Sequence, residues 1–116
     1  MKLAPGALVV VHLANPTEKF WGVLEGLEPV GATFRGISLD VFEEWMTEMA
    51  REGTPSLGLS TQFVPLFRLE RIFLDEPVGE VESYRQRLER RTRRPVAAIL
   101  DGIGTAPAEP DGAEPS

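Results

Sequence analysis

The first 39 residues alternate short apolar runs with turn residues, a pattern that predicts three consecutive β-strands. The first run, LVVVHL, covers 8–13 and ends before a turn at Asn15-Pro16. It is apolar on both of its faces, as in a strand of a small closed barrel that is buried on both sides. A second strand is expected at 20–27 and a third at 32–39, joined by the turn residues EPVG.

Glycine and proline residues indicate where these strands bend and where the sheet ends. Gly22 and Gly26 lie inside the second strand, where a glycine marks a bend, a bulge or a close approach of another backbone. A fourth strand is expected at 61–68, with Pro65 marking a bulge or an edge because proline has no ladder donor. A fifth strand at 71–75 follows after a single helical turn.

The apolar spacing changes to a helical period at Asp40, which predicts an inserted helix at 40–52. Asp40 with Glu43 three residues later is a capping-box pattern, and Gly53 stands where a helix-ending glycine is common. The apolar stripe must cover something apolar, most simply the outside or the open end of the barrel. It consists of Val41, Phe42, Trp45, Met46 and Met49.

The last third of the chain predicts a second helix and a polar tail. The helix is expected at 78–94, with acids first and arginines last, which suits the helix dipole. Pro95 ends it, VAAIL at 96–100 is a short apolar segment, and the Pro-, Ala-, Gly- and Glu-rich residues 101–116 are expected to be disordered. The predicted divisions are a barrel at 1–77, an arginine-rich helix at 78–94 and a tail at 95–116.

Composition narrows the class of protein further. The chain has 116 residues, enough for one domain, and no cysteine, which excludes a disulfide framework and a thiolate metal site. No apolar run approaches the roughly 20 residues that a membrane span needs. We therefore expect a cytoplasmic protein with no membrane segment, no metal and no cofactor.

The net charge of −6 is unevenly distributed along the chain. Residues 83–95 carry six arginines and one glutamate, a charge of +5, which leaves −11 on the rest. Clustered guanidinium groups are what a phosphate-contacting surface needs, and a solvated helix end that pairs with the acidic body is an equally open alternative. The candidate nucleic-acid contacts are Arg85, Arg87, Arg90, Arg91, Arg93 and Arg94, with Arg68 outside the helix.

The strand order, with a bent second strand and a short helical turn before the fifth, is typical of a small SH3-like barrel. Over about 8–76 the residues resemble the Sm-like superfamily, and within it the Hfq group of bacterial RNA chaperones. VVVHLANPTEKFWGVLEGLEPVGATFRGISL is similar to the first Sm motif, and QFVPLFRLERIFLDE looks like the second, a hairpin with a short helical joint. The glycine, aliphatic and acidic positions of the first motif fall on Gly22, Leu24, Glu25 and Glu28.

This resemblance implies a mainly β, five-stranded barrel and a role in RNA binding, with two departures. Hfq-like joints carry a lysine-histidine pair that helps to hold uridine-rich RNA, and about Leu66 and Phe67 stand there in this chain. The helix at 40–52 is inserted where Hfq has only a short turn. RNA contacts would then come from the arginine helix rather than from the family's pocket.

The resemblance also implies assembly of several copies. Sm-like barrels leave their fourth and fifth strands as edges, and unpaired edges with apolar side chains favour strand addition. A homo-oligomer is therefore expected. Its predicted interface consists of Gln62, Phe63, Val64, Ile72, Phe73 and Leu74.

Two functions remain open at this point. One is an oligomeric RNA-binding or post-transcriptional regulatory protein. The other is a protein-interaction or scaffold module without RNA binding, which would use Phe42, Trp45 and Met49 together with VAAIL. Enzymatic activity is not expected, because the single histidine, His12, has no clustered partner that would make a zinc site or a catalytic triad.

Overall fold

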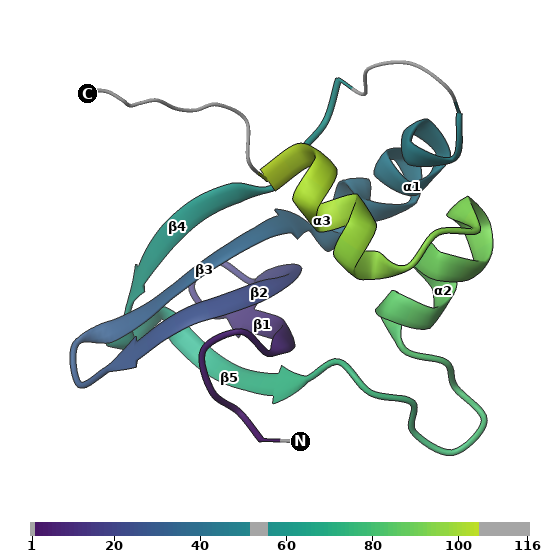
Figure 1. Ribbon diagram of the computed structural model, residues 1–116. Helices are drawn as coiled ribbons and strands as arrows, with labels where there is room; N and C mark the ends of the chain where they lie inside the picture. Colours follow the sequence, from purple (N-terminus) through teal and green to yellow (C-terminus); the bar gives the residue numbers. More distant parts are fainter. Residues whose placement is uncertain (1, 52–55, 105–116) are drawn as a thin grey trace.

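The computed structural model describes residues 2–51 and 56–104, and the side chains within these ranges as far as residue 100 (Figure 1). Its strands are β1 (Leu8–Leu13), β2 (Glu18–Glu28), β3 (Gly31–Ser38), β4 (Ser60–Pro65) and β5 (Leu69–Leu74). Its helices are η1 (Leu39–Val41), α1 (Phe42–Ala50), η2 (Leu66–Arg68), α2 (Tyr84–Thr92) and α3 (Val96–Gly104). The five strands form one antiparallel sheet in the order β4-β3-β2-β1-β5, which confirms five strands and a mainly β architecture. The fourth strand ends at Pro65 and not at 68, because residues 66–68 form η2, and the fifth begins at Leu69.

One face of the sheet carries an apolar cluster to which all five strands contribute, here called the inner core. It consists of Val9, Val11, Leu13, Phe20, Leu24, Phe34 and Val64, with Leu69, Ile72 and Leu74 packed against it. Strands β4 and β5 lie at opposite edges of the sheet and still contact the same cluster. The sheet therefore curves strongly around its inner face, as Figure 1 shows.

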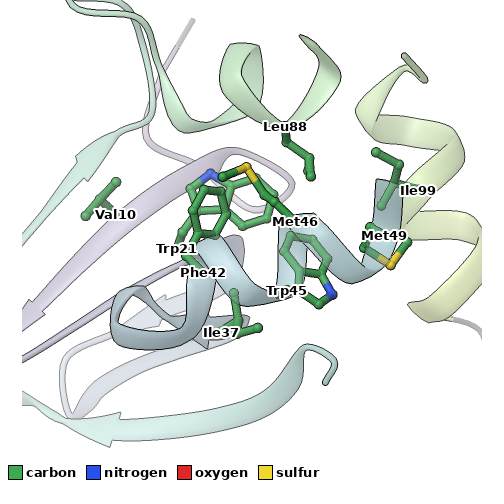
Figure 2. Packing of buried hydrophobic residues seen from close by; sticks show 9 residues of the cluster. All are labelled: Val10, Trp21, Ile37, Phe42, Trp45, Met46, Met49, Leu88 and Ile99. Carbon is green, nitrogen blue, oxygen red and sulfur yellow. The ribbon is translucent and has the colours of Figure 1, made fainter. Parts of the chain in front are cut away.

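The opposite face is covered by the helices, and this second cluster is called the outer core (Figure 2). Its members are Val10, Trp21, Ile37, Phe42, Trp45, Met46, Met49, Leu88 and Ile99. The rings of Trp21 and Trp45 pack with centroids 6.0 Å apart, so α1 lies directly on the sheet. The inserted helix covers the outer face of the sheet, which corresponds to the first of its two predicted positions, the outside and not the open end, and the predicted burial of β1 on both faces is confirmed.

Two glycines allow β2 and β3 to approach each other closely. Gly22 lies opposite Gly36, and a Cβ on Gly22 would lie 2.1 Å from the backbone oxygen of Arg35. Only glycine fits there, so the predicted close approach is confirmed. Gly26 lies beside a register shift that begins at Leu24, which is the second irregularity predicted for this strand.

The start of the inserted helix differs from the prediction. Asp40 is not its N-cap; the Ser38 hydroxyl accepts a hydrogen bond from the Asp40 N–H at 3.1 Å and caps η1. The regular helix then begins at Phe42, after Val41, which makes no side-chain cap. A 3₁₀ turn takes the place of the capping box because serine, one position before η1, already satisfies the free amide. Gly53 lies outside the described residues.

The second helix also starts later than predicted, at Tyr84 instead of 78. Its cap is a capping box between Ser83 and Gln86, a pattern that the sequence analysis missed. Val78 and Val81 form an isolated β-bridge before it. The segment at 96–100 is the first part of α3, and the helix continues to residue 104, so the disorder expected from residue 101 is wrong there; residues 105–116 lie outside the description.

Candidate interaction sites

The arginines of α2 contact the acidic α1 helix. Arg87 and Arg91 both form ion pairs with Glu43, the latter at 3.3 Å, and Arg91 also donates to the Thr47 hydroxyl at 2.8 Å. These contacts join residues more than 40 positions apart in sequence. The sequence left two interpretations of these arginines open, a phosphate-contacting surface and a helix end that pairs with the acidic body. These contacts correspond to the second interpretation.

Two further arginines of α2 are paired within their own region. Arg85 and Glu89 form an i,i+4 ion pair at 3.1 Å. Arg90 forms an ion pair with Glu82, and that carboxylate raises the pKa of the Arg90 guanidinium above its ordinary value. Surface ion pairs of this kind contribute little to stability, but they occupy the guanidinium groups.

The remaining predicted arginines have structural contacts or end the helix. Arg94 donates to the backbone oxygen of Met49 at 2.7 Å. Arg68 donates to the oxygens of Ala14 and Pro16 at 2.6 and 2.7 Å and so holds the β1–β2 turn. Arg93 is exposed, ends α2 in the left-handed region with φ 59°, and makes no ion pair within the described residues.

The partner-binding face predicted for the inserted helix is not exposed. Phe42, Trp45 and Met49 are 2%, 0% and 6% exposed, and all three belong to the outer core. Ile99 of the VAAIL segment is fully buried in the same cluster (Figure 2). Contacts within the chain therefore bury this surface. The prediction that it binds a partner is corrected accordingly.

Strand β4 is one edge of the sheet, which is one of the two alternatives, a bulge or an edge, predicted from Pro65. Leu66 N–H donates to Val30 O at 2.8 Å, and ladder bonds alternate along a strand, so Val64 also bonds toward β3. The backbone groups of Phe63 and the nitrogen of Pro65 therefore face away from β3. Proline has no N–H, and at this position no hydrogen bond of the sheet is lost. The Phe63 side chain is 53% exposed, whereas Val64 is buried in the inner core.

Strand β5 is the other edge. Asp75 N–H donates to Leu8 O at 2.9 Å, so the same alternation turns the backbone groups of Ile72 and Leu74 away from β1. Their side chains pack against the inner core, while the Phe73 side chain is 40% exposed on the outer face. Within the described residues neither edge pairs with a further strand. The predicted interface residues thus lie on the two free edges.

A row of three basic side chains crosses the outer face in register. Lys19 lies opposite His12, and His12 lies opposite Arg71. Strands lie about 4.8 Å apart, so the row is about 10 Å long. Partial burial, with the positive charges of Lys19 and Arg71, lowers the pKa of His12, while Glu70 acts in the opposite direction. The sequence analysis missed this row because only the strand register brings the three residues together.

An apolar groove of about 200 Å³ lies between β5 and the segment that leads to α2. Its exposed apolar lining comes from Phe73, Val78 and Val81, and the side chain of Tyr84 also lines it. Both valines fall inside the longer helix predicted from the sequence at 78–94. The capping box at Ser83 was the signal that the helix begins later and leaves them outside.

Other kinds of site find little support in the described part of the chain. There, no group of three or more His, Asp or Glu side chains is placed to hold a metal ion. The helices in residues 2–51 and 56–104 are all too short or too polar to cross a bilayer. Comparison of the chain with protein-family models, curated proteins and solved structures finds no match.

Proposed function

We propose that this chain is a non-catalytic, Sm-like module that forms homo-oligomers through β4 and β5 and serves protein–protein interaction. The observation that carries the proposal is the sheet order, which leaves the two edges open with Phe63 and Phe73 exposed beside them. Unpaired edges of this kind favour the addition of another strand. The absence of cysteine fits a reducing compartment, so a cytoplasmic location is part of the proposal.

The charge distribution favours protein interaction over RNA binding as the main role. Five of the six predicted arginines of the α2 region contact acids or a backbone oxygen of the chain itself. A phosphate would have to compete with these partners and with the negative charge of the surrounding body. The short helical joint between β4 and β5 carries exposed Leu66 and Phe67, which contact proteins more readily than phosphate.

Light scattering over micromolar concentrations tests the assembly. The wild-type chain should have a mass above that of the monomer, and Phe63→Lys should lower it, because a charge on an edge strand opposes strand addition. Val30→Lys is the matched control, since it adds the same charge at an exposed position in the β2–β3 turn, outside the strands. A wild-type chain that remains monomeric throughout the range would reject the proposal.

RNA binding is the second candidate function, and the basic row favours it. Lys19 and Arg71 form no ion pair within the described residues, unlike the arginines of α2 that pair with carboxylates. Lys19 and Arg71 lie on either side of His12, and a bound phosphate backbone would offset the repulsion between their two positive charges. This candidate moves the RNA contacts from the helix to the sheet.

Fluorescence anisotropy with a labelled single-stranded RNA, at two salt concentrations, separates the possibilities. Binding at the row should fall with salt at a log–log slope of about −0.7 per contact and should be lost in Lys19→Gln/Arg71→Gln. Replacement of Arg90, Arg91, Arg93 and Arg94 by glutamine should then have little effect. Loss of binding in that variant alone would place the site on α2, and no binding at low salt would leave protein interaction as the function.

A further inference from the structure

Two valines stand exposed on a rigid turn beside the sheet. Val78 and Val81 exchange backbone hydrogen bonds of 3.0 and 2.9 Å, and their side chains are 69% and 70% exposed. The Asp75 N–H bonds to β1 at the start of this segment, and Ser83 caps α2 at its end. The turn is therefore held at both ends, and its apolar side chains are presented to solvent in a fixed position.

These valines form a groove with the sheet. Phe73 lines the groove from β5, Tyr84 lines it from α2, and the buried Val10 also contributes. The volume of about 200 Å³ is below the roughly 300–1,000 Å³ of most small-molecule pockets, so it suits one bulky side chain rather than a cofactor. Exposed apolar surface concentrated at one place in this way commonly marks an interaction site.

The rim of the groove is acidic. The segment 75–82, DEPVGEVE, contains four carboxylates and no cation. Asp75 is used internally by Trp21 and the first turn of α2, and Glu82 pairs with Arg90. Glu76 and Glu80 remain exposed on the same turn, without an ion pair in the described part of the chain. Glu76 is one of the lining residues, so the groove combines apolar side chains with an exposed carboxylate, and Glu80 adds a second negative charge on the same turn.

We propose that this groove binds a partner protein through a short peptide segment with one bulky apolar residue between lysines or arginines. The apolar side chain occupies the space between Phe73, Val78 and Val81. The basic side chains pair with Glu76 and Glu80. The site is formed by side chains on the outer face and does not use the edge backbone groups through which the copies are proposed to assemble.

Amide chemical shifts of the full chain test this site with three synthetic peptides. GSKKLKKSG should shift the amides of Phe73, Val78 and Val81 in a saturable way. GSKKSKKSG tests charge alone, and GSEELEESG tests the apolar residue with the wrong charge. Both peptides should bind at least about tenfold more weakly than GSKKLKKSG. Equal binding of the serine peptide, or shifts that avoid the groove, would overturn the proposal.

Matched variants locate the binding and separate it from assembly. Val78→Ser/Val81→Ser should weaken GSKKLKKSG about tenfold while folding is kept, because both side chains are exposed. Val30→Ser, at a similarly exposed valine in the β2–β3 turn, should leave the affinity unchanged. In the Phe63→Lys chain, which should no longer assemble through its edges, shifts of the Val78 and Val81 amides that depend on protein concentration without peptide would identify a second copy as the occupant and reject the proposal. If Phe63→Lys changes the mass but not peptide affinity, the two sites are independent.

Discussion

The indole N–H of Trp21 donates to the carboxylate of Asp75 at 2.9 Å in the interior of the protein. The same carboxylate accepts the backbone N–H groups of Tyr84 and Arg85, each at 2.8 Å. One side chain after the last strand therefore joins the outer face of β2 to the first turn of α2. This contact determines where the α2 helix begins in space and, with it, the position of the groove beside β5.

Replacing Asp75 by alanine should lower the free energy of unfolding by about 2–4 kcal/mol, because the N–H groups of Tyr84 and Arg85 and the buried indole N–H of Trp21 lose their acceptor. Urea unfolding measures the change. Glu76→Ala, at the exposed neighbouring position, is the control and should stay within about 0.5 kcal/mol of wild type. Similar stabilities for the two variants would show that the Asp75 contacts do not stabilise the fold.

The two glycines of β2 allow a matched pair of substitutions whose effects on stability should differ. Gly22→Ala should destabilise by about 1–3 kcal/mol, because its Cβ would meet the backbone of Arg35 and the strands would have to separate. Gly26→Ala should be neutral or stabilise by up to about 1 kcal/mol, since no atom lies within 4 Å of that Cβ and its φ is not positive. Thermal melts of both variants test this, and a Gly22→Ala variant with the wild-type melting temperature would contradict the close approach.

Trp45→Ala should lower the free energy of unfolding by about 3–5 kcal/mol, because the side chain is fully buried between the sheet and the helices. Phe67→Ala removes a comparable apolar side chain that is 85% exposed, and it should change stability by less than about 0.5 kcal/mol. Guanidinium unfolding compares them. Equal losses would mean that the burial of Trp45 has been misjudged.

The pKa of His12 makes stability depend on pH. Its value in the folded state lies below the ordinary 6.5, so the unfolded chain binds more protons between the two values. The contribution to stability is fully present above pH about 6.5 and is lost as the pH falls through the folded-state pKa. As the only histidine, His12 gives a single set of imidazole resonances to titrate by NMR.

Lys19→Gln should move that titration toward the ordinary pKa, because it removes one of the two neighbouring positive charges. Lys2→Gln removes the same charge near the N-terminus, where it does not act on His12, and should leave the titration unchanged. A His12 resonance that titrates at the ordinary value in the wild type would mean that the basic row is not assembled as described.

The sequence by itself determined the local elements wherever period and turn chemistry agree. The apolar run at 8–13, the glycines of β2, the turn at 28–31 and Pro65 were sufficient to predict five strands and a bulge or an edge at Pro65, because each reflects the backbone of its own few residues. The apolar stripe of α1 was also sufficient to predict that this helix is docked, since so many large apolar side chains require a covering surface.

Only the tertiary structure decided the roles of the side chains. The arginines of α2 suggest a phosphate site in sequence, but Glu43, more than 40 positions away, pairs with two of them and Glu82 pairs with a third. Val78 and Val81 have a helical spacing, yet the capping box at Ser83 leaves them on a turn. Lys19, His12 and Arg71 become neighbours only through strand register. Which distant residues become neighbours depends on how the sheet curves and where the helices dock. Those features result from contacts along the whole chain and not from any one short segment.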